Sequence, residues 1–154
     1  MSTEILFISG APSTGKSTTI KEIHDYLKNN KHFVEIHNIS TTKKERAFIL
    51  EGYNKTGTKI NIFLNYAADN MGIIKKVHNF YNKHKPFDIV ITAIRDMYLE
   101  RSELLKIFNI NESFIEIPLA KVTRKKDKTQ ALNDYHARVF NLVTHILSLS
   151  PFYI

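Results

Sequence analysis

The sequence predicts an α/β fold, with a doubly wound, mainly parallel sheet of about five strands flanked by helices. Short apolar runs rich in β-branched residues alternate along the chain with longer segments in which apolar residues recur at helical spacing. The chain has 154 residues, of which 43% are hydrophobic and 24% are charged, and we find no internal repeat or linker in it. Since this length is enough to bury one core, we expect a single domain over residues 1–154.

The first half of the chain is expected to form strands around one helix. The expected elements are a strand at 4–9, a helix at 16–29, a strand at 33–36, and two strands at 47–53 and 59–64. Between the last two strands, Asn-Lys-Thr-Gly is typical of a turn. We therefore expect an antiparallel hairpin near residues 47–64, inserted at the edge of the sheet.

The second half is expected to alternate helix and strand. Its expected elements are a helix at 70–84, a buried strand at 88–93, a helix through 108, a strand within 113–119 and a long helix at 130–149. Pro86 and Pro151 follow the first and last of these helices and would end them.

The composition excludes several classes of protein. Without cysteine the chain has no disulfides, thiolate metal sites or cysteine nucleophiles. Its apolar runs are too short for a membrane span or a signal peptide, so we expect a cytoplasmic protein without a membrane partner. The net charge of +7 would attract nucleotides or nucleic acid, but it is equally typical of a lysine-rich surface. The seven histidines do not show the spacing of a zinc motif.

The segment GAPSTGKS, at residues 10–17, fits the pattern G-x-x-x-x-G-K-[ST] between a predicted strand and a predicted helix. Its glycines permit close approach of a phosphate, and its backbone N–H groups would converge on the anion at the positive end of the helix. A turn that only joined the strand to the helix would not require Lys16 and Ser17. Lys16 would contact the outer phosphates and Ser17 would bind Mg²⁺. The expected nucleotide-binding residues are Gly10, Ala11, Pro12, Ser13, Thr14, Gly15, Lys16, Ser17 and Thr18.

Through this strand, loop and helix the chain resembles the P-loop NTPase superfamily. The resemblance implies a doubly wound fold that uses Mg²⁺ with ATP or GTP. The Asn-Lys-x-Asp motif of regulatory GTPases is absent from the sequence, which makes ATP the expected donor. The small size and the N-terminal position of the loop are similar to the nucleotide and metabolite kinases, including the nucleoside monophosphate kinase and dephospho-coenzyme A kinase-like branch.

The segment FDIVITAIRD, at residues 87–96, resembles a strand of these kinases that commonly ends in Asp-Gly-hydrophobic-Arg. The match implies that Arg95 contacts the substrate or a phosphate, and it puts Thr92 where the acid would stand. A catalytic carboxylate would then come from Asp69 or Asp96, which follow apolar strands, with Asp69 preferred. The alternative is that each is an ordinary helix N-cap.

Between the strand near 113–119 and the last helix lies the densest basic run of the chain, where small kinases carry a mobile lid. Its members are Lys121, Arg124, Lys125, Lys126 and Lys128. Arg124 is the expected catalytic member because its planar guanidinium can donate hydrogen bonds to two phosphate oxygens at once. Arg138 is a weaker candidate. The alternative is a solvated, charged helix end. Near strand ends or turns, Tyr53, Tyr66 and Tyr98 could stack on a base.

These features predict an ATP-dependent phosphotransferase that moves the terminal phosphoryl group of Mg-ATP to a nucleotide, a nucleoside or a related small acceptor. Residues 41–66 would set the acceptor specificity. Two alternatives stay open. One is a kinase that acts on polynucleotides or on modified bases in nucleic acid. The other is a nucleotide-binding regulator or adaptor with little or no turnover, motivated by Thr92 in place of the expected acid and by the expected hairpin, which could serve a partner.

Overall fold

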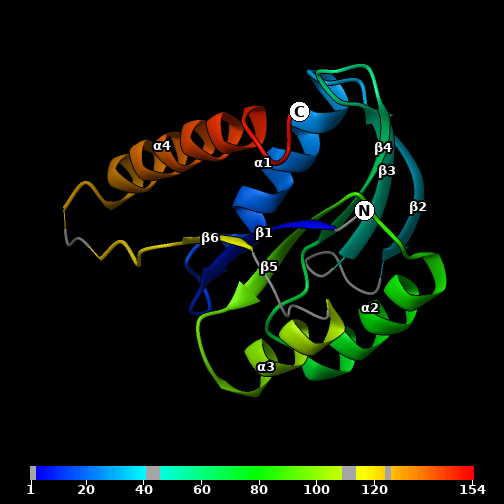
Figure 1. Cartoon of the computed structure of the whole chain (residues 1–154). Helices are drawn as coiled ribbons and strands as arrows, with labels where there is room; N and C mark the ends of the chain where they lie inside the picture. Colours follow the sequence, from blue (N-terminus) through cyan, green and yellow to red (C-terminus); the bar gives the residue numbers. More distant parts are fainter. Residues whose placement is uncertain (1–2, 41–45, 109–113, 124–125) are drawn as a thin grey trace.

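The computed structural model describes residues 3–40, 46–108, 114–123 and 126–154 of the chain. They form an α/β fold in which a six-stranded mixed sheet is flanked by four helices (Figure 1). The strands are β1 (Glu4–Gly10), β2 (Val34–Ser40), β3 (Arg46–Tyr53), β4 (Lys59–Asn65), β5 (Ile89–Arg95) and β6 (Ile115–Pro118). The helices are α1 (Lys16–Asn29), α2 (Met71–His84), α3 (Tyr98–Ile107) and α4 (Lys128–Ser148).

The strand order is β2-β3-β4-β5-β1-β6, so the N-terminal strand lies inside the sheet. β1 pairs in parallel with β5 and β6, and β4 pairs in parallel with β5. β3 is antiparallel to both of its neighbours. All strands except β3 therefore point the same way, which confirms a mainly parallel sheet. As a result, Gly10, Asn65 and Arg95, the last residues of β1, β4 and β5, end at one edge of the sheet.

The predicted hairpin forms, but the sheet has six strands instead of about five. β3 and β4 pair along their full lengths, from Ala47 opposite Asn65 to Tyr53 opposite Lys59. The hairpin is not simply attached at the edge, because β4 also joins β5 inside the sheet and β2 covers the outer side of β3. Periodicity predicts strands but not the neighbour that each strand takes, so the sheet order could not be read from the residues.

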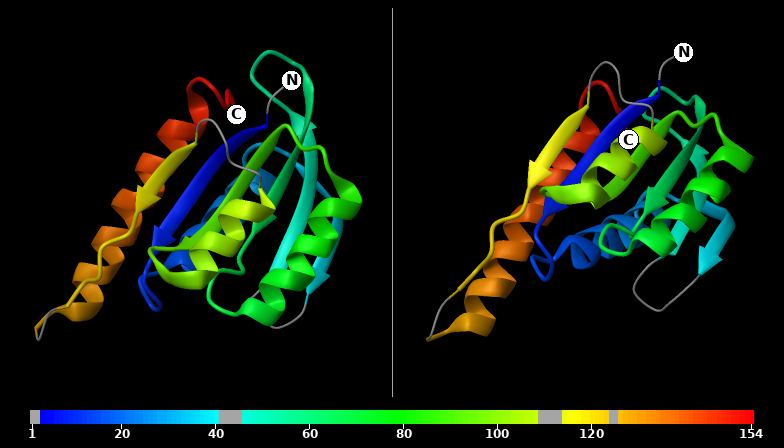
Figure 2. Two further views of the ribbon diagram at one scale, coloured as in Figure 1. Left: turned by 60° about the horizontal axis from the view of Figure 1, so that its bottom comes forward. Right: turned by 90° about the horizontal axis from the view of Figure 1, so that it is seen from below.

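The helices cover both faces of the sheet. α1 packs against α4 on one face and α2 packs against α3 on the other, as the views in Figures 1 and 2 show. β1 and β5 are buried along almost their whole length, which is the pattern expected for parallel strands covered on both sides. α1 buries Ile20, Ile23 and Leu27 against the sheet, as their helical spacing predicts.

Among the described residues, none of the helices is both long enough and apolar enough to cross a membrane.

Candidate nucleotide-binding site

The glycine-containing segment of the sequence forms a tight turn between the end of β1 and the start of α1. Ser13 and Gly15 have left-handed backbone conformations, with φ of 63° and 96°. The Thr14 hydroxyl donates a hydrogen bond of 2.8 Å to the Ala11 carbonyl inside the turn. Alternation of left-handed and right-handed residues points successive N–H groups toward one concavity, which is a geometry suited to anions.

Both glycines of the turn lie in crowded positions. A Cβ at Gly10 would collide with the Thr14 side chain, and a Cβ at Gly15 would collide with the imidazole of His136 on α4. Gly15 also precedes the first residue of α1 as its N-cap, and no acidic side chain lies in the first turn of that helix. The positive end of the α1 dipole is therefore not neutralised by a carboxylate from its own first turn.

Lys16 is the most buried cation of the site, because only 4% of its side chain is exposed. Its Nζ donates hydrogen bonds to the carbonyls of Gly10 at 3.0 Å and Ala11 at 2.9 Å. The Asp69 carboxylate lies 3.3 Å from the same nitrogen. Burial lowers the pKa of Lys16 below its ordinary value, and the charge of Asp69 opposes that shift. The ammonium is thus held within the turn, and a carboxylate from a different element helps to keep it charged.

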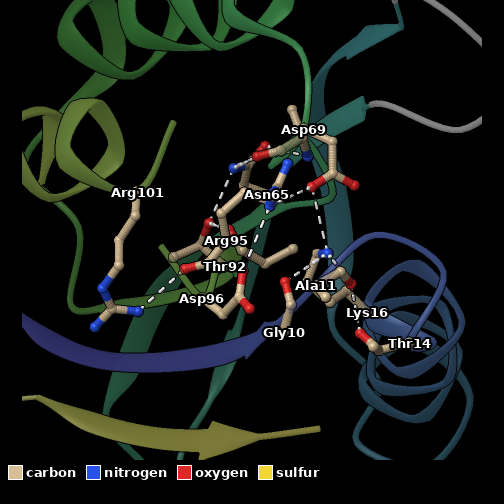
Figure 3. Close-up of polar contacts among 12 residues, drawn as sticks. Gly10, Ala11, Thr14, Lys16, Asn65, Asp69, Thr92, Arg95, Asp96 and Arg101 are labelled. Atoms are coloured by element: carbon tan, nitrogen blue, oxygen red, sulfur yellow. Dashed lines mark hydrogen bonds and ion pairs between the residues drawn. The ribbon is translucent and has the colours of Figure 1, made fainter. Parts of the chain in front are cut away.

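Asp69 also contacts the other cation of the site (Figure 3). Its Oδ1 lies 3.6 Å from Nε of Arg95, and Oδ1 of Asp96 lies at the same distance from that nitrogen. Arg95 stands opposite Gly10 in the register of β1 and β5, which explains why it reaches the turn. Within the described part of the chain, its buried Nε has no hydrogen-bond partner. The structure therefore brings together Lys16, Asp69, Arg95 and Asp96, four of the residues predicted from the sequence.

Neither aspartate is a helix N-cap, so that alternative is wrong. Asn70 caps α2, where its side chain accepts a hydrogen bond of 3.1 Å from the N–H of Ile73. The residue that precedes α3 is Met97. Asp69 lines the large cavity described below, whereas Asp96 is not among the described residues that line it. Of the two aspartates, Asp69 is therefore the one that lies beside both Lys16 and this cavity.

Thr92 does not lie at the site. It is fully buried and pairs in register with Phe7, three positions before the partner of Gly10. Its hydroxyl accepts a hydrogen bond of 2.9 Å from the Asn65 side chain and donates one of 2.8 Å to the Ala93 carbonyl. A carboxylate here would point into the core, so the presence of threonine removes no acid from the turn.

Sequence reasoning missed Asn65, the last residue of β4. Its side chain is fully buried, donates to the Ala67 carbonyl at 2.8 Å and accepts from the Ala67 N–H at 2.9 Å. These bonds fix the turn that leads from β4 to Asp69. Asparagine is common in such turns, but its position at a strand end was the only signal in the sequence.

A second missed contact involves Arg101 of α3, near the same edge of the sheet. Its guanidinium makes two hydrogen bonds to the Glu116 carboxylate of β6, at 2.8 and 3.1 Å, and donates to the Arg95 carbonyl at 3.1 Å. The bond to Arg101 lowers the pKa of Glu116. The pair of Arg101 and Glu116 connects α3 to β6, and the bond from Arg101 to the Arg95 carbonyl holds the backbone of Arg95 in place.

A cavity of about 1000 Å³ lies over the turn, and we call it the loop cavity. This volume is at the upper end of those found for small-molecule sites. Its described lining residues are Pro12, Ser13, Thr14, Gly15, Lys16, Ser17, Thr18, Tyr66, Asp69, Ala120, Lys121, Val122, Thr123, Lys128, Leu132 and His136.

The predicted lid is only partly described. The residues after β6 and the start of α4 project together beyond the sheet (Figure 1). Lys121 and Lys128 of the basic run line the loop cavity. Arg124 and Lys125 lie outside the described residues. Lys126 and Arg138 are exposed and are not among the described lining residues.

The three tyrosines considered for base stacking lie apart. Tyr53 ends β3 opposite Lys59, the first residue of β4, and therefore lies at the edge of the sheet away from the turn. The Tyr98 ring is exposed and lies 5.6 Å from the Arg95 guanidinium. Tyr66 lines the loop cavity.

A comparison of the chain with models of protein families and with the sequences of curated proteins finds no match.

Proposed function

We propose that the chain is an ATP-dependent phosphotransferase of the P-loop kinase type, which binds Mg-ATP at the turn of residues 10–18 and passes its terminal phosphoryl group to a small acceptor. One observation carries this proposal. The buried ammonium of Lys16 lies within hydrogen-bond distance of two carbonyls of the turn, at the positive end of α1, whose first turn holds no acidic residue, beneath a cavity large enough for a nucleotide.

In this proposal each residue of the site has a separate role. The N–H groups of the turn and of the first turn of α1 hold the β- and γ-phosphates. Lys16 exchanges its carbonyl partners for phosphate oxygens and stabilises the charge that develops on the transferring group. Arg95 is the second cation within reach. Asp69, in contact with both cations, keeps them oriented.

Magnesium would neutralise charge on the β- and γ-phosphates. The residues present fit this ion, because it needs few protein ligands and keeps several waters. Ser17 is exposed at the start of α1 and lines the loop cavity, so its hydroxyl is the candidate ligand. The Asp69 carboxylate lines the same cavity and could hold a metal-bound water.

The regulator alternative was motivated by Thr92 and by the hairpin, which could serve a partner. Thr92 is buried in the core while Asp69 and Asp96 accompany Lys16 and Arg95, which supports the kinase. The hairpin of β3 and β4 is present, so the regulator stays the alternative. A kinase acting on nucleic acid uses the same donor site, and it is distinguished only by the acceptor.

The proposal is tested by measuring ADP release from Mg-ATP with a panel of nucleosides, nucleotides, single-stranded DNA and duplex DNA. We expect one class of acceptor to raise the rate well above hydrolysis in buffer. Stimulation by DNA alone, with binding that weakens steeply as salt rises, would establish the nucleic-acid alternative. Tight binding of Mg-ATP without stimulation by any member and without hydrolysis would contradict the kinase proposal and favour a regulator.

A further inference from the structure

A second cavity, of about 670 Å³, lies beside α1 and over β2 and β3. Its described lining residues are Lys21, His24, Asp25, Lys28, Glu35, Asn38, Arg46, Phe48 and Tyr66. Of the residues described as lining this cavity and the loop cavity, Tyr66 is the one that they share. A molecule in the second cavity would therefore meet the terminal phosphate of a nucleotide near the Tyr66 phenol.

The Tyr66 phenol is the end of a chain of three polar side chains from different elements. Its hydroxyl lies 3.0 Å from Nδ1 of His24, and Nε2 of that ring lies 3.4 Å from Oε1 of Glu35. His24 is buried and also packs its ring on Phe48, with centroids 4.3 Å apart. The contact with Glu35 lacks the geometry of a hydrogen bond, but among the described residues it is the polar contact that Nε2 has.

This arrangement orients the proton of the phenol. A carboxylate can only accept, so the neutral imidazole carries its proton on Nε2, toward Glu35. Nδ1 then accepts a hydrogen bond from the Tyr66 O–H. A lone pair of the phenol oxygen is left to accept a hydrogen bond from a molecule in either cavity. Burial lowers the pKa of His24 and raises the pKa of Tyr66, so both groups are neutral near pH 7.

The wall of the second cavity favours an anionic molecule. Lys21 and Lys28 lie seven residues apart on α1 and therefore on the same face of that helix, and Arg46 of β3 lines the same cavity. Two carboxylates are also present. Glu35 keeps its negative charge beside the neutral His24 and the Asn38 amide at 3.4 Å. The described wall therefore carries three cations and the two carboxylates of Glu35 and Asp25.

We propose that the second cavity, hereafter the acceptor cavity, binds a small anionic molecule with a free hydroxyl group, and that Tyr66, backed by His24 and Glu35, accepts the proton of that hydroxyl during phosphoryl transfer. This inference rests on the proposed kinase function and adds the class of acceptor. A phosphate acceptor would present an oxygen that is already ionised at neutral pH, and it would have no use for a proton acceptor.

The acceptor oxygen forms a bond to the γ-phosphorus while the bond from that phosphorus to the bridging oxygen of ADP breaks, and ADP leaves. The hydroxyl proton passes to the Tyr66 oxygen as the phenol's own proton passes to Nδ1 of His24. The resulting imidazolium faces Glu35, and it loses its proton to solvent before the next turnover.

The test uses the full chain with Mg-ATP and, as probes, the four 2′-deoxynucleoside 5′-monophosphates and the corresponding uncharged nucleosides. Each monophosphate offers both a 3′-hydroxyl and a phosphate to the donor, and ³¹P NMR of the product distinguishes a new phosphomonoester from a diphosphate. We expect the phosphomonoester, and a higher kcat/KM for the monophosphates than for the nucleosides. A diphosphate product, or an equal kcat/KM for the nucleosides, would overturn the assignment of the acceptor.

Tyr66→Phe is expected to lower kcat by about 100-fold, the usual scale for loss of a proton acceptor, with the KM for ATP unchanged. The matched control is Tyr26→Phe, because Tyr26 is on the same helix as His24 but packs its ring on Phe140 of α4.

If no probe is phosphorylated, hydrolysis of Mg-ATP serves as the readout, with water as the hydroxyl. Full kcat in Tyr66→Phe, for either reaction, would overturn the role of the phenol. Failure of the wild type in both reactions would instead contradict the proposed function, and the acceptor assignment with it.

A pH profile separates this role from a merely structural one. Among the described residues, the charged or titratable groups that line the cavity with His24 are Lys21, Asp25 and Lys28 on α1, Glu35 on β2, Arg46 on β3, and Tyr66. Neutral His24 is the active form, so kcat should fall as pH decreases through its lowered pKa. Glu35 raises the pKa of His24, and Glu35→Gln should therefore move this acid limb to lower pH as well as reduce kcat. An acid limb that does not move in Glu35→Gln would contradict the relay.

Discussion

Lys16→Ala is expected to weaken binding of Mg-ATP and to lower kcat by at least about 100-fold, since removal of one preorganised donor to developing charge typically costs this much or more. The Lys16 ammonium is buried within the turn and held 3.3 Å from the Asp69 carboxylate, so the substitution removes a cation that is already in position. Isothermal titration calorimetry gives the affinity, and coupled ADP release gives kcat.

The matched control for this variant is Lys75→Ala. Lys75 is exposed on α2, on the other face of the sheet from α1, and its replacement removes the same charge from the molecule. We expect its affinity for Mg-ATP to equal that of the wild type. An equal loss in both variants would mean that the general positive charge of the protein attracts the nucleotide and that the turn makes no specific contact.

Asp69→Asn is expected to reduce turnover by orders of magnitude while the affinity for Mg-ATP is retained. Its carboxylate contacts Lys16 at 3.3 Å and Arg95 at 3.6 Å, so the substitution disturbs both cations that would face the transferring phosphoryl group. The phosphates themselves are held by N–H groups, which the substitution does not alter. Single-turnover kinetics with saturating Mg-ATP separates this loss from a binding defect.

Asp96→Asn provides the comparison, because Asp96 contacts Arg95 at the same distance but does not contact Lys16 in the described structure. We expect a much smaller loss of turnover in this variant. The pH dependence differs as well. Burial lowers the pKa of Lys16 and Asp69 opposes that shift, so in Asp69→Asn the alkaline limit of Mg-ATP binding should move to lower pH. Equal losses in the two variants would contradict the assignment of Asp69.

Much of the site could be predicted because its residues lie close to one another in sequence or end neighbouring strands. The turn and α1 are local structures, and α1 begins at Lys16 and ends at Asn29 as the helical spacing predicts. Asp69 and Arg95 come from different strands, and they meet because the carboxyl ends of parallel strands share one edge of the sheet.

What the sequence did not reveal depends on the order of the strands. In the sequence, Thr92 occupies the position expected for a catalytic acid. The register of β1 and β5 pairs it with Phe7, three residues before Gly10 at the start of the turn. His24, Glu35 and Tyr66 had no common motif, since 42 residues separate His24 from Tyr66, and they meet only after β2, β3 and β4 pair beside α1. The spacing of the histidines in the sequence indicated only that they do not form a zinc motif.

Binding of the phosphates of Mg-ATP at the turn of residues 10–18 is tested most directly by titrating ¹⁵N-labelled protein with Mg-ATP and recording ¹H–¹⁵N correlation spectra of the assigned backbone amides. We expect the largest chemical-shift changes at the N–H groups of residues 13–18, and we expect these changes to be absent in Lys16→Ala. If these amides do not respond to Mg-ATP, or if the largest shifts lie on another face of the molecule, the turn does not hold the phosphates and the proposed function is wrong.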